Sequence, residues 1–456
     1  MSTNIWHILG AIIIILASIR GALVLHFGFP PTNTYQISAL SFILLGFFSF
    51  LLIQFKYPNR ELILLINVIN LNVFFLSFYL VGMISLLGFK YIDMVYLFGI
   101  FPIIFWLIEY KHKLLILIVY SALFITGFGV IYFYYVGITS GINGVGEMIT
   151  TLRPNTGPDA ERLGYSRIGE AILPGGYQAN HHDAAQIIVM GIALFFSKFI
   201  NASSFTTKCF MLSIFLFFCF LLLLTGSTAN TLVAGFVILI GSLYYIRKNQ
   251  FALIIIITFF AIFVSFLYDY IEEYLYFYSK LTADYSGRES GGIYAALNLA
   301  AIYESLPSLF FGMGVVFNAP MIKSEVGFLS LLSTIGLLPF ILTMFICFSP
   351  VYYILNFRKR VYLLNKIYIT KGLSSYGKEM NSLFRTQYIN LIMASMPVLA
   401  GSLTLIHYGS LFRITSIGLF CVFLALFFKE YLIAITLIDF EKKKIFVNKY
   451  SKNTTK

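Results

Sequence analysis

Charged residues are scarce in this chain. Only 11% of its 456 residues are Asp, Glu, Lys or Arg, whereas 59% are hydrophobic and 18% are aromatic, and the mean hydropathy is +0.87. A soluble domain of this length with so few charges would expose a large apolar surface to water. The composition therefore excludes a soluble globular protein and predicts an all-α polytopic membrane protein, with residues 1–456 forming a single integral membrane domain.

Cysteine is also scarce, and the chain contains no CxxC pair. The cysteines lie inside apolar runs or at their edges, which argues against both a disulfide framework and a metal site built on thiolates; they are Cys209, Cys219, Cys347 and Cys421. We expect no metal and no cofactor. The first apolar run lacks a basic start and a small-residue cleavage site, so we expect it to be retained as a span and not removed as a signal peptide.

Apolar runs of about 17 to 25 residues recur from end to end, and each can cross a hydrocarbon layer of about 30 Å as a helix. We predict about twelve transmembrane helices from these runs. They lie near residues 5–25, 37–55, 62–87, 92–108, 114–136, 184–200, 208–224, 229–246, 251–270, 326–355, 387–406 and 414–436.

Basic residues follow a regular pattern between these spans. Every second connection is basic, and the basic residues stand at Lys56 and Arg60, Lys111 and Lys113, Lys198 and Lys208, Arg247 and Lys248, Arg358 to Arg385, and the "EKKK" of residues 441–444. By the positive-inside rule these connections are cytoplasmic, and so are both termini. The net charge of +12 is thereby explained by insertion topology, and we expect no nucleic acid partner.

Two long connections then fall on the outer side of the membrane, over residues 137–183 and 271–325. Both are rich in Gly and Pro and hold arginines on the side where positive charge is usually avoided. The second contains a run with helical apolar spacing, Tyr294–Leu309, which we expect to end at Pro307 and to lie in the membrane interface. Loops of this length in a compact protein are usually functional or disordered. We therefore look for function in these two loops.

The first outer loop contains the polar stretch "YSRIGEAILPGGYQANHHDAAQIIV", residues 165–189. A guanidinium binds phosphate oxygens in a bidentate way, so its arginines are candidates for holding an anionic substrate. The histidines are candidates for hydrogen bonds to a sugar or a phosphate, although the last acid can also cap the following helix. The candidate residues here, together with Arg20 near the outer end of the first span, are Arg162, Arg167, Tyr177, His181, His182 and Asp183.

Three further motifs follow. Residues 221–241, "LLLLTGSTANTLVAGFVILIG", interrupt an apolar sequence with a polar turn, which a helix hairpin with glycine in its turn also explains. Arg288 lies between glycines in the second outer loop, beside the expected interface helix. Glu325 lies at the outer mouth of a span, where it could stabilise a helix N-terminus or, with a pKa raised by partial burial, act as a general base.

The order of these motifs resembles that of the O-antigen and capsule polysaccharide polymerase and O-antigen ligase superfamily. Members carry a polar TGS turn, a large external loop with an arginine and a later G.G, and a helix start of the pattern H/E…G(F/Y)L…L…G. The corresponding residues are 225–227, 288–314 and 325–336. The chain lacks the arginine that commonly follows the TGS serine. It has Glu325 where ligases typically place a histidine, which favours a polymerase.

The resemblance implies a GT-C-like membrane enzyme that transfers glycan from a polyprenyl-diphosphate donor to a lipid-linked acceptor, without a metal. It implies that Arg288 and Arg167 stabilise the departing diphosphate and that Glu325, His181 or His182 accepts the proton of the attacking hydroxyl. The expected location is the plasma (inner) membrane of a bacterium. Expected partners are the polyprenyl-diphosphate-linked oligosaccharide, membrane lipids, a chain-length regulator and a flippase.

Two other functions remain open on the sequence alone. A ligase would move finished polymer onto lipid A core or onto a protein. A lipid-linked oligosaccharide flippase or transporter would place charges inside its spans and have short outer loops, whereas here most outer charges lie in two long loops.

Overall fold

A computed structural model of the chain describes residues 2–55, 59–87, 101–109, 112–152, 175–178, 181–246, 306–312, 327–370, 374–406 and 414–453. Helices and short turns make up these ranges, which contain no strand. Seven of the described helices are long and apolar enough to cross a membrane, and two shorter apolar helices accompany them. The expected all-α fold is confirmed for the described residues, and their long apolar helices are compatible with a polytopic membrane protein, whereas the number of about twelve spans stays a prediction.

The helices coincide with the apolar runs because a helix satisfies every backbone hydrogen bond internally in lipid. The first half of the chain supplies α1 (Ser2–Phe27), α2 (Pro31–Phe55), η1 (Arg60–Leu62), α3 (Ile63–Leu87), α6 (Ile103–Ile108) and α7 (His112–Leu152). The second half supplies η4 (Gly176–Gln178), α9 (His181–Asn201), α10 (Phe205–Leu224), α11 (Thr228–Ile246), α15 (Leu306–Phe311), α16 (Gly327–Ile335), α17 (Leu337–Thr370), α18 (Ser374–Leu403), η6 (Thr404–Ile406) and α19 (Ile414–Asn453). The expected span at 251–270, and most of the one at 92–108, lie outside the described residues.

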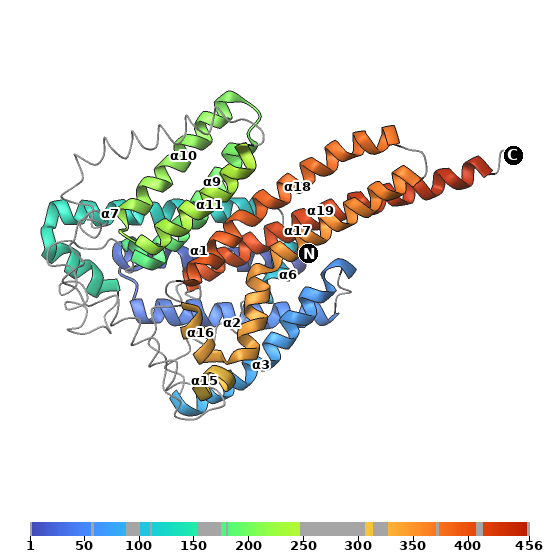
Figure 1. Cartoon of the computed structure of the whole chain (residues 1–456). Coiled ribbons are helices and arrows are strands. Elements are labelled where there is room, and N and C mark those ends of the chain that lie inside the picture. Colours follow the sequence, from blue (N-terminus) through green and yellow to red (C-terminus); the bar gives the residue numbers. More distant parts are fainter. Residues whose placement is uncertain are drawn as a thin grey trace.

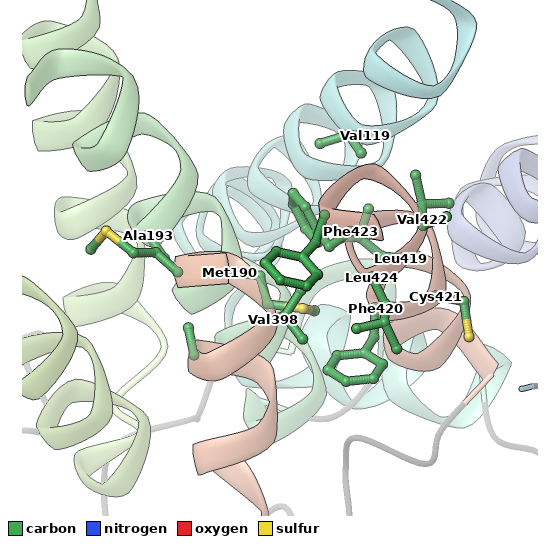
Figure 2. Close-up of a cluster of buried hydrophobic side chains, with 14 of the residues drawn as sticks. Val119, Met190, Ala193, Val398, Leu419, Phe420, Cys421, Val422, Phe423 and Leu424 are labelled. Carbon is green, nitrogen blue, oxygen red and sulfur yellow. The ribbon is translucent and has the colours of Figure 1, made fainter. Parts of the chain in front are cut away.

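The middle of the bundle is formed around α19. Residues 419–424 of this helix lie among side chains of α7, α9 and α18, including Val119, Met190 and Val398 (Figure 2). Large apolar side chains such as Leu232 of α11 instead point outward and are exposed. An apolar interior together with an apolar exterior is the arrangement that a lipid environment requires.

The apolar run at 326–355, expected to be one span, is divided in two. α16 ends at Ile335 and α17 begins at Leu337, with Gly336 between them at φ +83°. A positive φ is accessible to glycine at little cost, whereas an L side chain is strained there. Gly336 lies directly against the backbone of Gly312, which follows α15. Hydropathy did not show this break because both sides of it are apolar.

The first outer loop, expected from residue 137, begins with helical structure. α7 is interrupted at Gly141, with φ +62°, and continues to Leu152. Beyond the interruption, Val145 and Met148 form a small apolar cluster with Phe133 of the preceding segment. In the second loop, Pro307 lies in the first turn of α15 and does not end a helix, because proline is well tolerated at a helix start. Residues 294–305 of the expected interface helix lie outside the described ranges.

The basic connection expected at residues 358–385 is largely helical. α17 continues to Thr370, α18 begins at Ser374, and the two extend together with the C-terminal half of α19 away from the rest of the bundle (Figure 1, orange to red). Arg360 of α17 forms a bidentate ion pair with Glu61 of η1, with one N···O distance of 2.9 Å. α1 begins on the side toward which this extension points, and the location of both termini in the cytoplasm stays a prediction.

Candidate functional site

Polar side chains gather at one end of the bundle. There α1 ends, α9 begins, and a turn joins α10 to α11 (Figure 1). The short helix η4 packs against α1, α7 and α9 at this same end. Motifs that lie far apart in the sequence thus meet at one end of the bundle.

The turn "TGS" closes α10 and opens α11. The Thr225 hydroxyl donates to the carbonyl of Leu222 at 2.6 Å, and Gly226 takes φ +65°, as glycine commonly does just past a helix end. The Thr231 hydroxyl donates to the Ser227 carbonyl at 2.9 Å. The structural interpretation of this motif, in which hydroxyls satisfy the ends of a helix hairpin, is therefore confirmed.

Ser227 also links the turn to the first outer loop. Its hydroxyl oxygen is 3.3 Å from Nδ1 of His182 and accepts a hydrogen bond from Nδ2 of Asn230 at 2.9 Å. The Ser227 hydroxyl has one donor and two acceptor positions, so it can serve Asn230 and His182 at once, and its role toward His182 is set by the imidazole tautomer. Ser227 and Asn230 are both buried, so the histidine is held by an interior pair.

The other residues of the "HHD" sequence have separate surroundings. The rings of His181 and His182 are close, with centroids 3.7 Å apart. Asp183 is buried in the first turn of α9, where the helix dipole stabilises a negative charge. One turn further along α9, Nε2 of Gln186 donates a hydrogen bond to Oγ1 of Thr404 at 2.6 Å. This last bond joins α9 to η6.

An aromatic cluster that the sequence did not reveal lies beside these histidines. Nε2 of His26 is 2.9 Å from the hydroxyl of Tyr177, and the two rings are edge to face. The ring of Tyr132 stacks on that of Tyr177 at 6.0 Å and meets His26 edge to face at 4.9 Å. Burial, and secondarily the neighbouring Tyr132, raise the pKa of the Tyr177 hydroxyl, so it keeps its proton at neutral pH.

Glycines position Tyr177 in this cluster. A Cβ atom on Gly21 of α1 would lie 1.8 Å from the Tyr177 carbonyl oxygen, and one on Gly129 of α7 would lie 2.8 Å from the Tyr177 nitrogen. Gly176 has φ +55°, and a Cβ atom on it would lie 2.4 Å from the carbonyl carbon of Gly129. Three backbones therefore meet without side chains between them, which fixes the position of η4.

Arg20 lies on α1 next to this contact. It is half-buried and immediately precedes Gly21, the glycine that meets the Tyr177 backbone. With a rise of about 1.5 Å per residue, it lies about 9 Å along α1 from His26, closer to the interior of the bundle. Of the predicted substrate-binding residues, the structure thus brings Arg20, Tyr177, His181, His182 and Asp183 to one end of the bundle.

The remaining predicted residues, Arg162, Arg167, Arg288 and Glu325, lie outside the described ranges. Their meeting across the site stays a prediction. α16, which begins two residues after Glu325, packs against η6, and η6 in turn bonds to α9 through Thr404. The described parts of the second-loop motif and of the first are therefore connected by direct contacts.

The described part of the chain contains no group of three His, Cys, Asp or Glu side chains that could hold a metal ion. All four cysteines are unpaired, and three of them are buried. The prediction that they form no disulfide framework is confirmed.

Comparisons with known proteins gave no match. No protein-family model, no curated protein and no solved structure matches this chain. The membrane fold class thus rests on the described helices, and any function must be argued from the motifs and from the geometry of the site.

Proposed function

We propose that this protein is a repeat-unit polymerase for O-antigen or capsule. It would transfer glycan from a polyprenyl-diphosphate donor to a lipid-linked acceptor at the outer face of a bacterial plasma membrane. Both termini would be cytoplasmic, and the two long loops would lie outside. The long apolar helices support this proposal because both substrates carry lipid tails that need a membrane-embedded enzyme.

The contact between His182 and Ser227 carries the proposal. It joins the start of α9, which follows the first outer loop, to the TGS turn, one of the motifs that resemble the polymerase superfamily. The hydroxyl and amide groups at the centre of this contact are buried at one end of an otherwise apolar bundle. Buried polar networks at such a depth are costly unless satisfied and often mark functional sites in membranes.

The proposed reaction assigns each charged group a role. The attacking sugar hydroxyl would lose its proton to Glu325, or to His181 or His182, as its oxygen bonds to the anomeric carbon of the donor. The bond from that carbon to the diphosphate breaks, and the electron pair leaves with the polyprenyl diphosphate. Arg288 and Arg167 would stabilise the charge that develops on this leaving group.

Deletion of the gene in its host, followed by electrophoresis of the surface glycan, tests the reaction class. A polymerase predicts that the ladder of long chains disappears while a single repeat unit is still attached to the surface lipid. Full-length polymer left on the polyprenyl carrier would indicate a ligase. Repeat units trapped on the cytoplasmic face would indicate a flippase, and either result would refute the proposal.

Complementation of the deletion strain tests the charged residues. Arg288→Ala and Glu325→Gln should each fail to restore the ladder, whereas Arg288→Lys, which keeps the charge but loses the planar fork, should restore it in part. The assignment fails if both the alanine and the glutamine variants restore full-length glycan at normal expression.

A second complementation tests the described contact. Ser227→Ala removes one hydrogen bond to His182, worth about 0.5 to 1.5 kcal/mol, and should slow polymerisation about two- to tenfold. Ser204→Ala removes a hydroxyl from the opposite end of the same helices, where it caps α10 through the Thr207 nitrogen. This matched control should lower stability only. Equal glycan from the two variants would contradict a role for the Ser227 contact.

A further inference from the structure

The cluster of His26, Tyr132 and Tyr177 has no part in the charge chemistry proposed above, yet its rings come from three separate elements. His26 lies in the last turn of α1, Tyr132 lies on α7, and Tyr177 lies in η4. His26 is exposed, and the two tyrosines are half-buried. The cluster thus offers aromatic surface at the end of the bundle where the polar motifs meet.

This arrangement differs from an ordinary aromatic belt at a membrane interface. Belt residues act singly, with an apolar ring toward lipid and a polar tip toward the headgroups. Here the Tyr177 hydroxyl is bonded to His26, and its ring is stacked on Tyr132. The backbone of Tyr177 is fixed by contact with Gly21 and Gly129. Such close backbone packing holds the rings in one place before any ligand arrives, which lowers the entropic cost of binding.

The next residue supplies a second, independent feature. Gln178 is buried, with 4% of its surface exposed, and its Nε2 has no hydrogen-bond partner among the described residues. Buried polar groups are nearly always hydrogen-bonded, so a buried amide donor without a partner needs an explanation. A ligand that presents an oxygen acceptor next to the aromatic rings would provide one.

We infer that His26, Tyr132, Tyr177 and Gln178 form a carbohydrate-binding platform, and this inference rests on the proposed polymerase function. A pyranose ring has an apolar face of C–H groups and a rim of hydroxyls. The face matches an aromatic ring, and the rim matches an imidazole and a primary amide. None of the four side chains carries a fixed charge. The platform therefore takes the neutral sugar portion of the lipid-linked oligosaccharide, and the diphosphate is left to the arginines.

The position of Arg20 agrees with this division. It precedes Gly21, which contacts the Tyr177 backbone, and lies about 9 Å along α1 from His26. A glycan bound on the rings would thus extend outward from the membrane, with its charged anchor toward the arginine. The platform adds His26, Tyr132 and Gln178 to the substrate-binding residues expected from the sequence.

Binding of a defined probe to the full-length protein in lipid nanodiscs tests the platform. The probe is the repeat-unit oligosaccharide of the host, released from its polyprenyl carrier by mild acid, and the readout is saturation-transfer NMR. The wild-type protein should saturate the sugar protons, and Tyr132→Leu should weaken binding about tenfold. Phe128→Leu is the matched control, because Phe128 lies on α7, is 60% exposed and is outside the cluster. No binding by the wild type, or equal binding by Tyr132→Leu, would overturn the inference.

A second variant separates binding from folding. Gln178→Leu removes a buried donor without a partner, so the apparent melting temperature should be unchanged or higher while affinity falls. A parallel loss of stability and affinity would indicate that Gln178 is structural, and would overturn its assignment to the platform.

The two proposals can fail separately. If deletion of the gene leaves the glycan ladder intact while the probe still binds and Tyr132→Leu weakens it, the polymerase function is refuted and the platform stands. If deletion abolishes the ladder while Tyr132→Leu binds the probe and polymerises like the wild type, the platform is refuted and the function stands.

Discussion

The contact between α1 and η4 predicts that Gly21→Ala lowers the stability of the protein. Alanine is favoured over glycine inside a helix by about 1 kcal/mol, so Gly21→Ala would stabilise α1 if nothing opposed the new methyl group. That methyl would lie 1.8 Å from the Tyr177 carbonyl oxygen, whereas Cβ atoms essentially never come closer than 3.0 Å to such atoms. The overlap can be removed only if the backbone shifts, and overpacking of this kind typically costs about 1 to 3 kcal/mol of stability.

A contact made by backbone belongs at the upper end of that range, so we expect a net loss of about 2 kcal/mol for Gly21→Ala. Gly235→Ala is the matched control, because Gly235 lies in α11 with nothing within 4 Å of the added Cβ. This variant should be neutral or more stable, by up to about 1 kcal/mol. The free energies of unfolding of the two variants should therefore differ by about 2 to 3 kcal/mol, with Gly21→Ala the less stable.

Thermal unfolding of the purified protein in detergent, followed by fluorescence-detected size exclusion, provides the measurement. Heating of membrane proteins is commonly irreversible, so the apparent melting temperatures must be compared at one heating rate. Gly21→Ala should melt below the wild type, and Gly235→Ala at or above it. If Gly21→Ala melts as high as Gly235→Ala, the close contact between α1 and η4 is refuted, and with it the argument that η4 is held rigidly.

Two further predictions concern the side of the protein expected to be cytoplasmic. Arg360→Ala should lower the free energy of unfolding by about 1 to 3 kcal/mol, because it leaves the partly buried Glu61 without its bidentate partner. Arg360→Lys should recover only part of this loss, and equal melting temperatures for the wild type and Arg360→Ala would contradict the prediction. Cys209 is the one exposed cysteine of the four and lies next to a connection expected to be cytoplasmic. A membrane-impermeant maleimide should therefore label it in inverted membrane vesicles and not in intact cells. Labelling in intact cells and not in inverted vesicles would refute the predicted topology.

The helices were predictable because the length of an apolar run reports the thickness of the membrane. The same signal says nothing about where a helix ends in water. α17 continues past its apolar part to Thr370, and α18 starts at Ser374, so a basic connection became a helical extension. Tertiary contacts stabilise this extension, such as the hydrogen bond from the Tyr368 hydroxyl to Glu441 at 3.3 Å. Such contacts depend on pairings that hydropathy does not encode.

The candidate site was predictable only where its residues are close in sequence. Tyr177, His181 and His182 were identified as one polar stretch, and the structure keeps them at one end of the bundle. His26 and Tyr132 were missed because each lies in an apolar run, Tyr132 beside further aromatic residues, and polar aromatic residues in such runs usually only mark the membrane interface. The available signal was one helical glycine a few residues before each of them, Gly21 and Gly129, and glycine in a span has several explanations.

The glycines of the second-loop motifs have a structural origin that separates them from the proposed chemistry. Gly312 and Gly336 both have positive φ, and a Cβ on either would meet the other's nitrogen within 3 Å. The end of α15 and the break before α17 thus cross backbone to backbone, where no side chain fits. α16 is held by this crossing at its C-terminal end and packs on η6, which bonds to α9. The motif glycines therefore position α16, and their presence alone does not indicate a catalytic role.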